Sequence, residues 1–160
     1  MSAEDRTTRA EEAYHLAFEY EKEYGCCPQC VLTAVKETVG YVTDETIKAS
    51  HGLSGGGSLT GSGTCGALSG ALMALSAKRG RDADKLDKGK RIGNFQSGRQ
   101  IVERFAEEFG GTTCEELQER FTGQTYDLWD REAYSQFDRA REDKCAYATA
   151  LVTRWVVEEL

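Results

Sequence analysis

The chain has 160 residues, of which 39% are hydrophobic and 29% charged, and its formal net charge is -7. This length suits one ordinary domain with its own core, and the surplus of acid disfavours nucleic acid and anionic membrane surfaces as partners. No apolar run approaches the roughly 20 residues of a membrane span, and residues 1–15 lack the apolar centre of a signal peptide. We therefore expect a cytoplasmic protein.

Apolar residues recur at helical spacing through the first third of the chain. Residues 6–24 predict an amphipathic helix that ends at Gly25. A second helix is expected from Cys27, because Pro28 suits the first turn of a helix. Thr43 can cap a short third helix that follows.

A glycine-rich stretch at residues 52–63 leads into a fourth helix, which should begin at Thr64 or Cys65. Its small residues at positions 66, 70 and 74 favour tight packing against another helix, with close approach of a bulky cofactor as the alternative. Residues 81–90 predict a solvated, charged connector. The next helix should end at Gly110, and its expected inner face comprises Ile92, Phe95, Val102, Phe105 and Phe109.

The C-terminal third starts with a helix whose first turn carries a capping box, Thr113 with Glu116. Residues 122–140 are ambiguous, and a final helix is expected from about Glu142. No strand-like alternation is found. The predicted fold is all-α, a compact single-domain helical bundle over residues 1–160 with about four to seven helices and a glycine-rich loop.

The six cysteines carry the functional signal, because thiols in a reducing cytosol serve metal binding or redox chemistry more often than disulfides. Cys27, Cys65, Cys114 and Cys145 all fall at or near predicted helix N-termini. Free N–H groups and the helix dipole there favour thiolates, so we expect lowered pKa values for these thiols. Thiolates are the form that ligates metals and attacks disulfides.

Two neighbouring motifs leave several chemistries open. Cys27 and Cys30 form a CxxC pair, which occurs in thiol–disulfide, zinc and iron–sulfur sites alike. Consecutive glycines can turn N–H groups toward one anionic centre, so Gly56, Gly57 and Gly66 are candidate cofactor-binding residues. No Gly-Lys-Ser/Thr follows, which disfavours a phosphate loop.

The order of these motifs resembles the C_GCAxxG_C_C family of redox-active proteins, also met as a domain in split-Soret cytochromes. Matching segments are Cys27-Pro28-Gln29-Cys30-Val31-Leu32, Gly55-Gly56-Gly57, Cys65-Gly66-Ala67-Leu68-Ser69-Gly70, Phe109-Gly110 with Cys114, and Cys145. The resemblance covers roughly residues 10–160 and implies a helical domain whose four cysteines gather at one redox or iron–sulfur site. Cys26 and Cys30 are extras, and either Cys27 or Cys30 would be the first ligand.

Three functions remain in view. The leading prediction is an iron–sulfur protein with Cys27, Cys65, Cys114 and Cys145 as ligands, transferring electrons to an unidentified redox partner. The alternatives are a metal-free thiol–disulfide oxidoreductase that uses Cys27 and Cys30, with Cys65 as a possible third thiol, and a structural zinc-binding domain. The apolar face of the first helix could pack within the monomer or form a homodimer.

Overall fold

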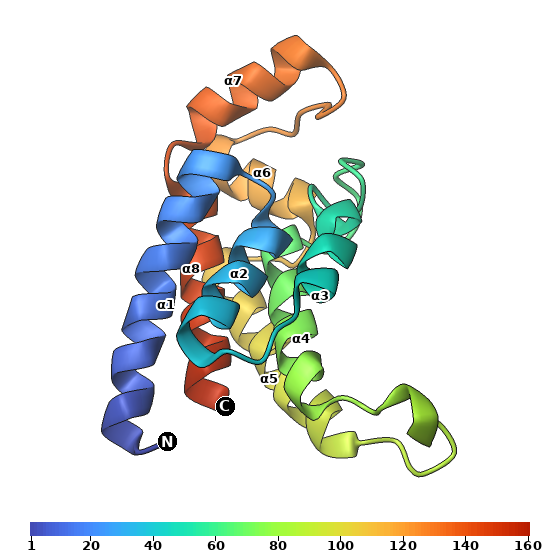
Figure 1. Ribbon diagram of the computed structural model, residues 1–160. Helices are drawn as coiled ribbons and strands as arrows, with labels where there is room; N and C mark the ends of the chain where they lie inside the picture. Colours follow the sequence, from blue (N-terminus) through green and yellow to red (C-terminus); the bar gives the residue numbers. More distant parts are fainter.

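Helices make up the fold in the computed structural model, which describes residues 1–160 (Figure 1). The α-helices are, in chain order, α1 (Ala3–Tyr24), α2 (Cys27–Val39), α3 (Asp44–Ala49), α4 (Gly66–Arg79), α5 (Ile92–Phe109), α6 (Cys114–Thr122), α7 (Arg131–Arg141) and α8 (Lys144–Glu159). Short 3-10 turns lie at His51–Leu53 and Ala83–Lys85. The all-α prediction is confirmed, with one helix more than the upper expectation because α7 occupies part of the ambiguous segment.

Several helix boundaries follow the capping signals in the sequence. The side chain of Thr43 accepts a hydrogen bond from the backbone N–H of Thr46 at the start of α3. Thr113 and Glu116 form the reciprocal capping box of α6. Gly110 ends α5 in the left-handed conformation, with φ of 75°. These local signals therefore fix the residues at which α3 and α6 begin and α5 ends.

The core lies where α1, α2, α4 and α8 pack together, with α5 against α4 and α8. Three fully buried alanines of α1, at positions 10, 13 and 17, allow close approach to α8. Large apolar side chains that are fully buried come from α2, α4, α5 and α8, among them Val31, Leu32, Val35, Leu68, Leu75, Phe105, Val152 and Val156. None of the helices is long and apolar enough to cross a membrane.

Small residues bring α4 against the start of α2. A Cβ added at Gly70 would lie 2.8 Å from the Cα of Pro28, and one at Gly66 would lie 2.8 Å from the Pro28 Cδ. Only glycine permits this approach. The expected tight helix contact is confirmed, and it brings together the N-termini of α2 and α4.

The start of α5 departs from the sequence prediction. Ile92 and Phe95, expected on the inner face, are 56% and 64% exposed. They follow the connector of residues 81–90, which is exposed throughout and projects from the helices (Figure 1). The first turns of α5 therefore extend beyond the core, and Ile101, Phe105 and Phe109 form its buried face.

Candidate functional site

Cysteines from four helix starts line one cavity. Cys27 is the first residue of α2, Cys65 is the N-cap of α4, Cys114 is the first residue of α6, and Cys145 is the second residue of α8. The cavity has a volume of about 50 Å³, which is room for a few water molecules. Residues separated by more than a hundred positions in the sequence thus line one partly open cavity.

A short pairing of extended backbone places two of these cysteines side by side. Thr64 and Thr113 form an isolated antiparallel bridge, and each directly precedes a cysteine of the cavity. The Cys65 N–H donates to the carbonyl of Thr112 at 2.7 Å, and the Cys114 N–H donates to the carbonyl of Gly63 at 3.0 Å. The bridge therefore holds the N-terminus of α4 next to the N-terminus of α6.

The glycine-rich loop supports the cavity differently from the prediction. Gly66 lines it, as does Gly55, whereas Gly56 and Gly57 lie outside the lining. A Cβ on Gly56, whose φ is +77°, would come within 3.0 Å of the Cys114 Cβ, while Gly57 faces open space. Gly56 thus lets the loop pass close beneath a cysteine, and the predicted cofactor contact of Gly56 and Gly57 finds no counterpart in the lining.

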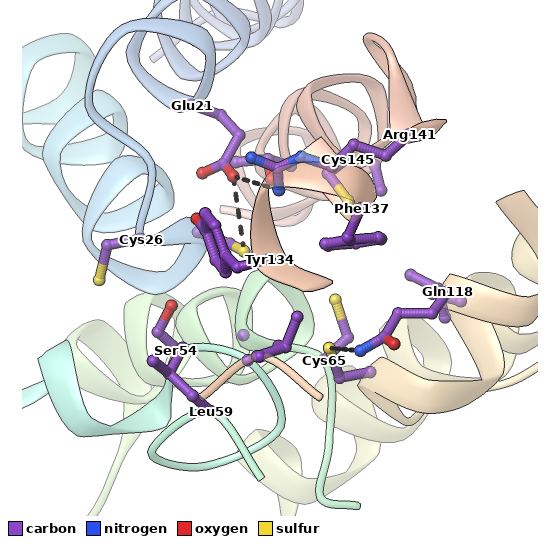
Figure 2. Close-up of a pocket in the computed structure, with 18 residues that line it drawn as sticks. Glu21, Cys26, Ser54, Leu59, Cys65, Gln118, Tyr134, Phe137, Arg141 and Cys145 are labelled. Atoms are coloured by element: carbon purple, nitrogen blue, oxygen red, sulfur yellow. Dashed lines mark hydrogen bonds and ion pairs between the residues drawn. The ribbon is translucent and has the colours of Figure 1, made fainter. Parts of the chain in front are cut away.

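Gln118 of α6 is a buried polar side chain that contacts one of the thiols (Figure 2). Its Oε1 accepts a hydrogen bond from the backbone N–H of Tyr126 at 2.8 Å. This contact fixes the orientation of the amide, so that Nε2 donates to Sγ of Cys114 at 3.3 Å. An N–H donor is thereby directed at a sulfur of the cavity.

Glu21 of α1 places a carboxyl group at the cavity with only 4% of the residue exposed. Its Oε1 accepts a hydrogen bond from Sγ of Cys27 at 3.8 Å and lies 3.6 Å from Nη1 of Arg141. Its Oε2 has no partner. Burial raises the pKa of Glu21, and the Arg141 charge opposes that shift.

The helix α7 covers one side of the cavity with side chains at helical spacing, Tyr134, Phe137 and Arg141. The Arg141 guanidinium lies 5.2 Å from the centre of the Phe137 ring (Figure 2). It also pairs with Asp138 at 2.7 Å. Phe137 is the one fully buried residue of α7. The helix α7, which buries few of its residues, therefore places the positive charge of Arg141 near the thiols.

The thiol pKa values contradict the prediction that helix N-termini would lower them. Burial raises the pKa of Cys65 to about 12 and that of Cys145 to about 11, and it places the pKa of Cys27 well above its usual range. The pKa of Cys114 is raised by burial as well. Loss of water around an anion outweighs the helix dipole here. The expectation was wrong because exposure could not be read from the sequence.

The two extra cysteines are arranged differently from the four. Cys30 does not line the cavity, and its Sγ donates to the carbonyl of Gly25 at 3.0 Å. Cys26 lies at the cavity edge, where its Sγ donates to the carbonyl of His51 at 3.9 Å. Of the CxxC pair, Cys27 is therefore the residue that faces the other three cysteines.

Five cysteines line the cavity, and the four predicted ligands among them offer four sulfurs, a set typical of zinc and of iron–sulfur clusters. No group of three His, Cys, Asp or Glu side chains is arranged to hold a single metal ion. By the chemistry of their donor atoms, four thiols fit either group.

Glu21, Gln118 and Arg141 were not identified from the sequence. Each is polar and lies on a helix with ordinary charged neighbours, so no motif sets it apart. The one available signal was position, because Glu21 falls on the otherwise apolar face of the first helix, next to three buried alanines.

Comparison with known proteins gives one match. Residues 25–159 match the model of the family described as "Putative redox-active protein (C_GCAxxG_C_C)". No curated protein and no solved structure matches the chain. Since the match spans most of the chain, the protein belongs to the C_GCAxxG_C_C family of redox-active proteins.

Proposed function

We propose that this protein transfers electrons through an iron–sulfur cluster held by Cys27, Cys65, Cys114 and Cys145. The observation that carries the proposal is the convergence of these four cysteines, from four helix starts, on one cavity. Tetrathiolate ligation is the common way to hold such clusters, which supply one-electron chemistry when bound.

Surrounding residues support this assignment through their charge and hydrogen bonds. Gln118 donates an N–H to the sulfur of Cys114, and N–H donors to ligand sulfurs tune the reduction potential of a cluster. The Arg141 guanidinium and the four helix N-termini lower the energy of negative charge in the cavity. Tyr134 and Phe137 shield it from water.

Thiol–disulfide exchange within the cavity is the second candidate. It is favoured by the contact between the Cys27 thiol and the Glu21 carboxyl group, which is placed to take up the proton of an attacking thiol. The pair considered from the sequence, Cys27 with Cys30, is less suited, because Cys30 does not line the cavity and its thiol donates to the carbonyl of Gly25.

The deciding experiment is iron, sulfide and zinc analysis of protein purified without oxygen, combined with visible absorption and electron paramagnetic resonance after reduction. We expect iron and sulfide in the wild type, and their loss in the serine variants of the four cavity cysteines. Cys30→Ser is the matched control, because it removes a thiol from the same helix outside the cavity lining, and it should keep the cluster.

Two results would overturn the proposal. Wild-type protein with neither iron nor sulfide would remove the cluster, and a reversible change in titratable thiols would then favour exchange chemistry. Stoichiometric zinc in place of iron would point to a structural metal site.

A further inference from the structure

A buried hydroxyl group without a hydrogen-bond partner belongs to the wall of the cysteine-lined cavity. Thr149 of α8 lines this cavity, and 0% of the residue is exposed. Its Oγ1 neither donates nor accepts a hydrogen bond within the chain. Buried hydroxyl groups are nearly always paired, because an unpaired one loses its hydrogen bonds to water without replacement. The missing partner of Thr149 therefore points to a group that binds in the cavity.

The other buried threonines of the helices show which bond Thr149 lacks. A threonine inside a helix can donate to the backbone carbonyl one turn earlier. Thr38 donates in this way to Ala34 at 2.8 Å, and Thr153 donates to Thr149 at 2.7 Å. The hydroxyl of Thr149 makes no such bond to the carbonyl of Cys145. It is therefore free to donate to a group outside its own helix.

The acceptors that the cavity offers to this hydroxyl are mainly sulfurs. Cys145 and Thr149 are four residues apart, so they lie on one face of α8. Five of the residues that line the cavity are cysteines. The one other side-chain oxygen of the lining that is buried without a partner is Oε2 of Glu21, so the two oxygens do not bond each other. A sulfur is therefore the acceptor that this lining favours.

The shape of the side chain gives no reason for a hydroxyl at this position. Valine has the same shape as threonine and would carry no unpaired polar atom into the core. The hydroxyl can turn about the Cα–Cβ bond, so it can meet an acceptor without a shift of the backbone. Packing alone thus does not account for threonine at position 149, whereas a hydrogen bond to a bound group does.

We propose that Thr149 tunes the redox site, by donating a hydrogen bond from its hydroxyl to a sulfur of the site and so raising the reduction potential. The inference rests on the proposed iron–sulfur function. Reduction adds negative charge to the site, and an O–H donor at a sulfur stabilises that charge. Gln118 already supplies one donor, from α6. Thr149 supplies a second donor, from α8.

The test compares the reduction potentials of the anaerobically purified wild type and three variants, Thr149→Val, Thr149→Ser and Thr153→Val. Valine removes the hydroxyl and keeps the shape, whereas serine keeps the hydroxyl. Thr153→Val is the matched control, because Thr153 is a buried threonine one turn further along α8 that does not line the cavity. Iron and sulfide are measured on each sample, and visible absorption follows each redox titration.

We expect Thr149→Val to lower the potential, and we expect Thr149→Ser and Thr153→Val to leave it close to that of the wild type. Urea unfolding of the metal-free chains gives a second readout. Thr149→Val should not destabilise the fold, because its hydroxyl has no bond there to lose. Thr153→Val should destabilise it, because the bond to the carbonyl of Thr149 is lost.

The possible failures can be told apart by the metal analysis. An iron-loaded Thr149→Val with the wild-type potential would overturn the inference and leave the proposed cluster standing. The same shift in the valine and serine variants would do so as well, since the hydroxyl would then not be its cause. A wild type without iron and sulfide would remove the proposed cluster and the role of Thr149 together.

Discussion

Replacing Glu21 with glutamine should remove a pH dependence of stability that the reduced, metal-free wild type shows in the pH interval above about 4.3, the pKa of a glutamate in the unfolded chain. Burial raises the pKa of Glu21, so the folded chain binds more protons in this interval than the unfolded chain does. The unfolding free energy of the wild type therefore falls as the pH rises. Glutamine keeps the shape of the side chain and does not titrate.

The size of the effect follows from the titration of the unfolded chain. An unfolded glutamate has a pKa of about 4.3 and has lost most of its proton by pH 5. Each pH unit over which folded Glu21 keeps its proton lowers the unfolding free energy by about 1.4 kcal/mol. The upper limit over two units is about 2.7 kcal/mol. Arg141, 3.6 Å from Oε1, reduces that value by favouring the charged form.

Urea unfolding at a series of pH values measures this difference directly. Subtracting the wild-type curve from the Glu21→Gln curve cancels all other titrating groups, and the gap should widen in favour of the variant as the pH rises. Glu19→Gln, an exposed position on the same helix, is the control and should run parallel to the wild type. Parallel curves for Glu21→Gln, or a gap that narrows toward pH 7, would refute the reasoning.

The remaining predictions concern a helix contact, a helix cap and the buried thiols. Gly70→Ala should lower the unfolding free energy by about 1–3 kcal/mol, because its Cβ would lie 2.8 Å from Pro28, whereas Gly93→Ala meets nothing and should not destabilise the fold in a thermal melt. Thr113→Ala should cost about 1 kcal/mol through loss of the α6 cap, with Thr112→Ala as a neutral control in the same assay. The cavity thiols of the metal-free chain should react with a disulfide reagent at least about tenfold more slowly at pH 7 than after unfolding. The reason is that burial raises the pKa values of these thiols. Equal reaction rates in the folded and unfolded chain would contradict this prediction.

Helix positions could be predicted because the signals that set them are local. The N-cap of Thr43, the capping box at Thr113 and the glycine at position 110 each act through neighbouring residues. The exposure of Phe95 could not, since it depends on how far α5 extends past the core. The helix α7 was missed because its sequence is mostly polar and only Phe137 is buried, so few apolar residues mark it as a helix.

Part of the candidate site could likewise be predicted from the sequence, and part of it could not. That Cys27, Cys65 and Cys114 fall at helix starts could be read from the chain, because proline, glycine and threonine mark those starts, and Cys145 lies near the start of the apolar C-terminal helix. Which thiol of the CxxC pair faces the cavity could not, because it depends on the left-handed backbone of Cys26, with φ of 62°. The polar residues around the thiols come from α1, α6 and α7, so only packing brings them together.

Burial and the helix N-termini act on the cavity thiols in opposite directions, and their balance bears on how a cluster would bind. In the metal-free chain burial dominates, so the thiols keep their protons at neutral pH. Ligation requires thiolates, and each ligand must then release its proton. The helix ends and Arg141 stabilise the negative charge that remains. Cluster loading should therefore release protons and become more favourable as the pH rises, whereas a preformed thiolate site would load equally well across the same range.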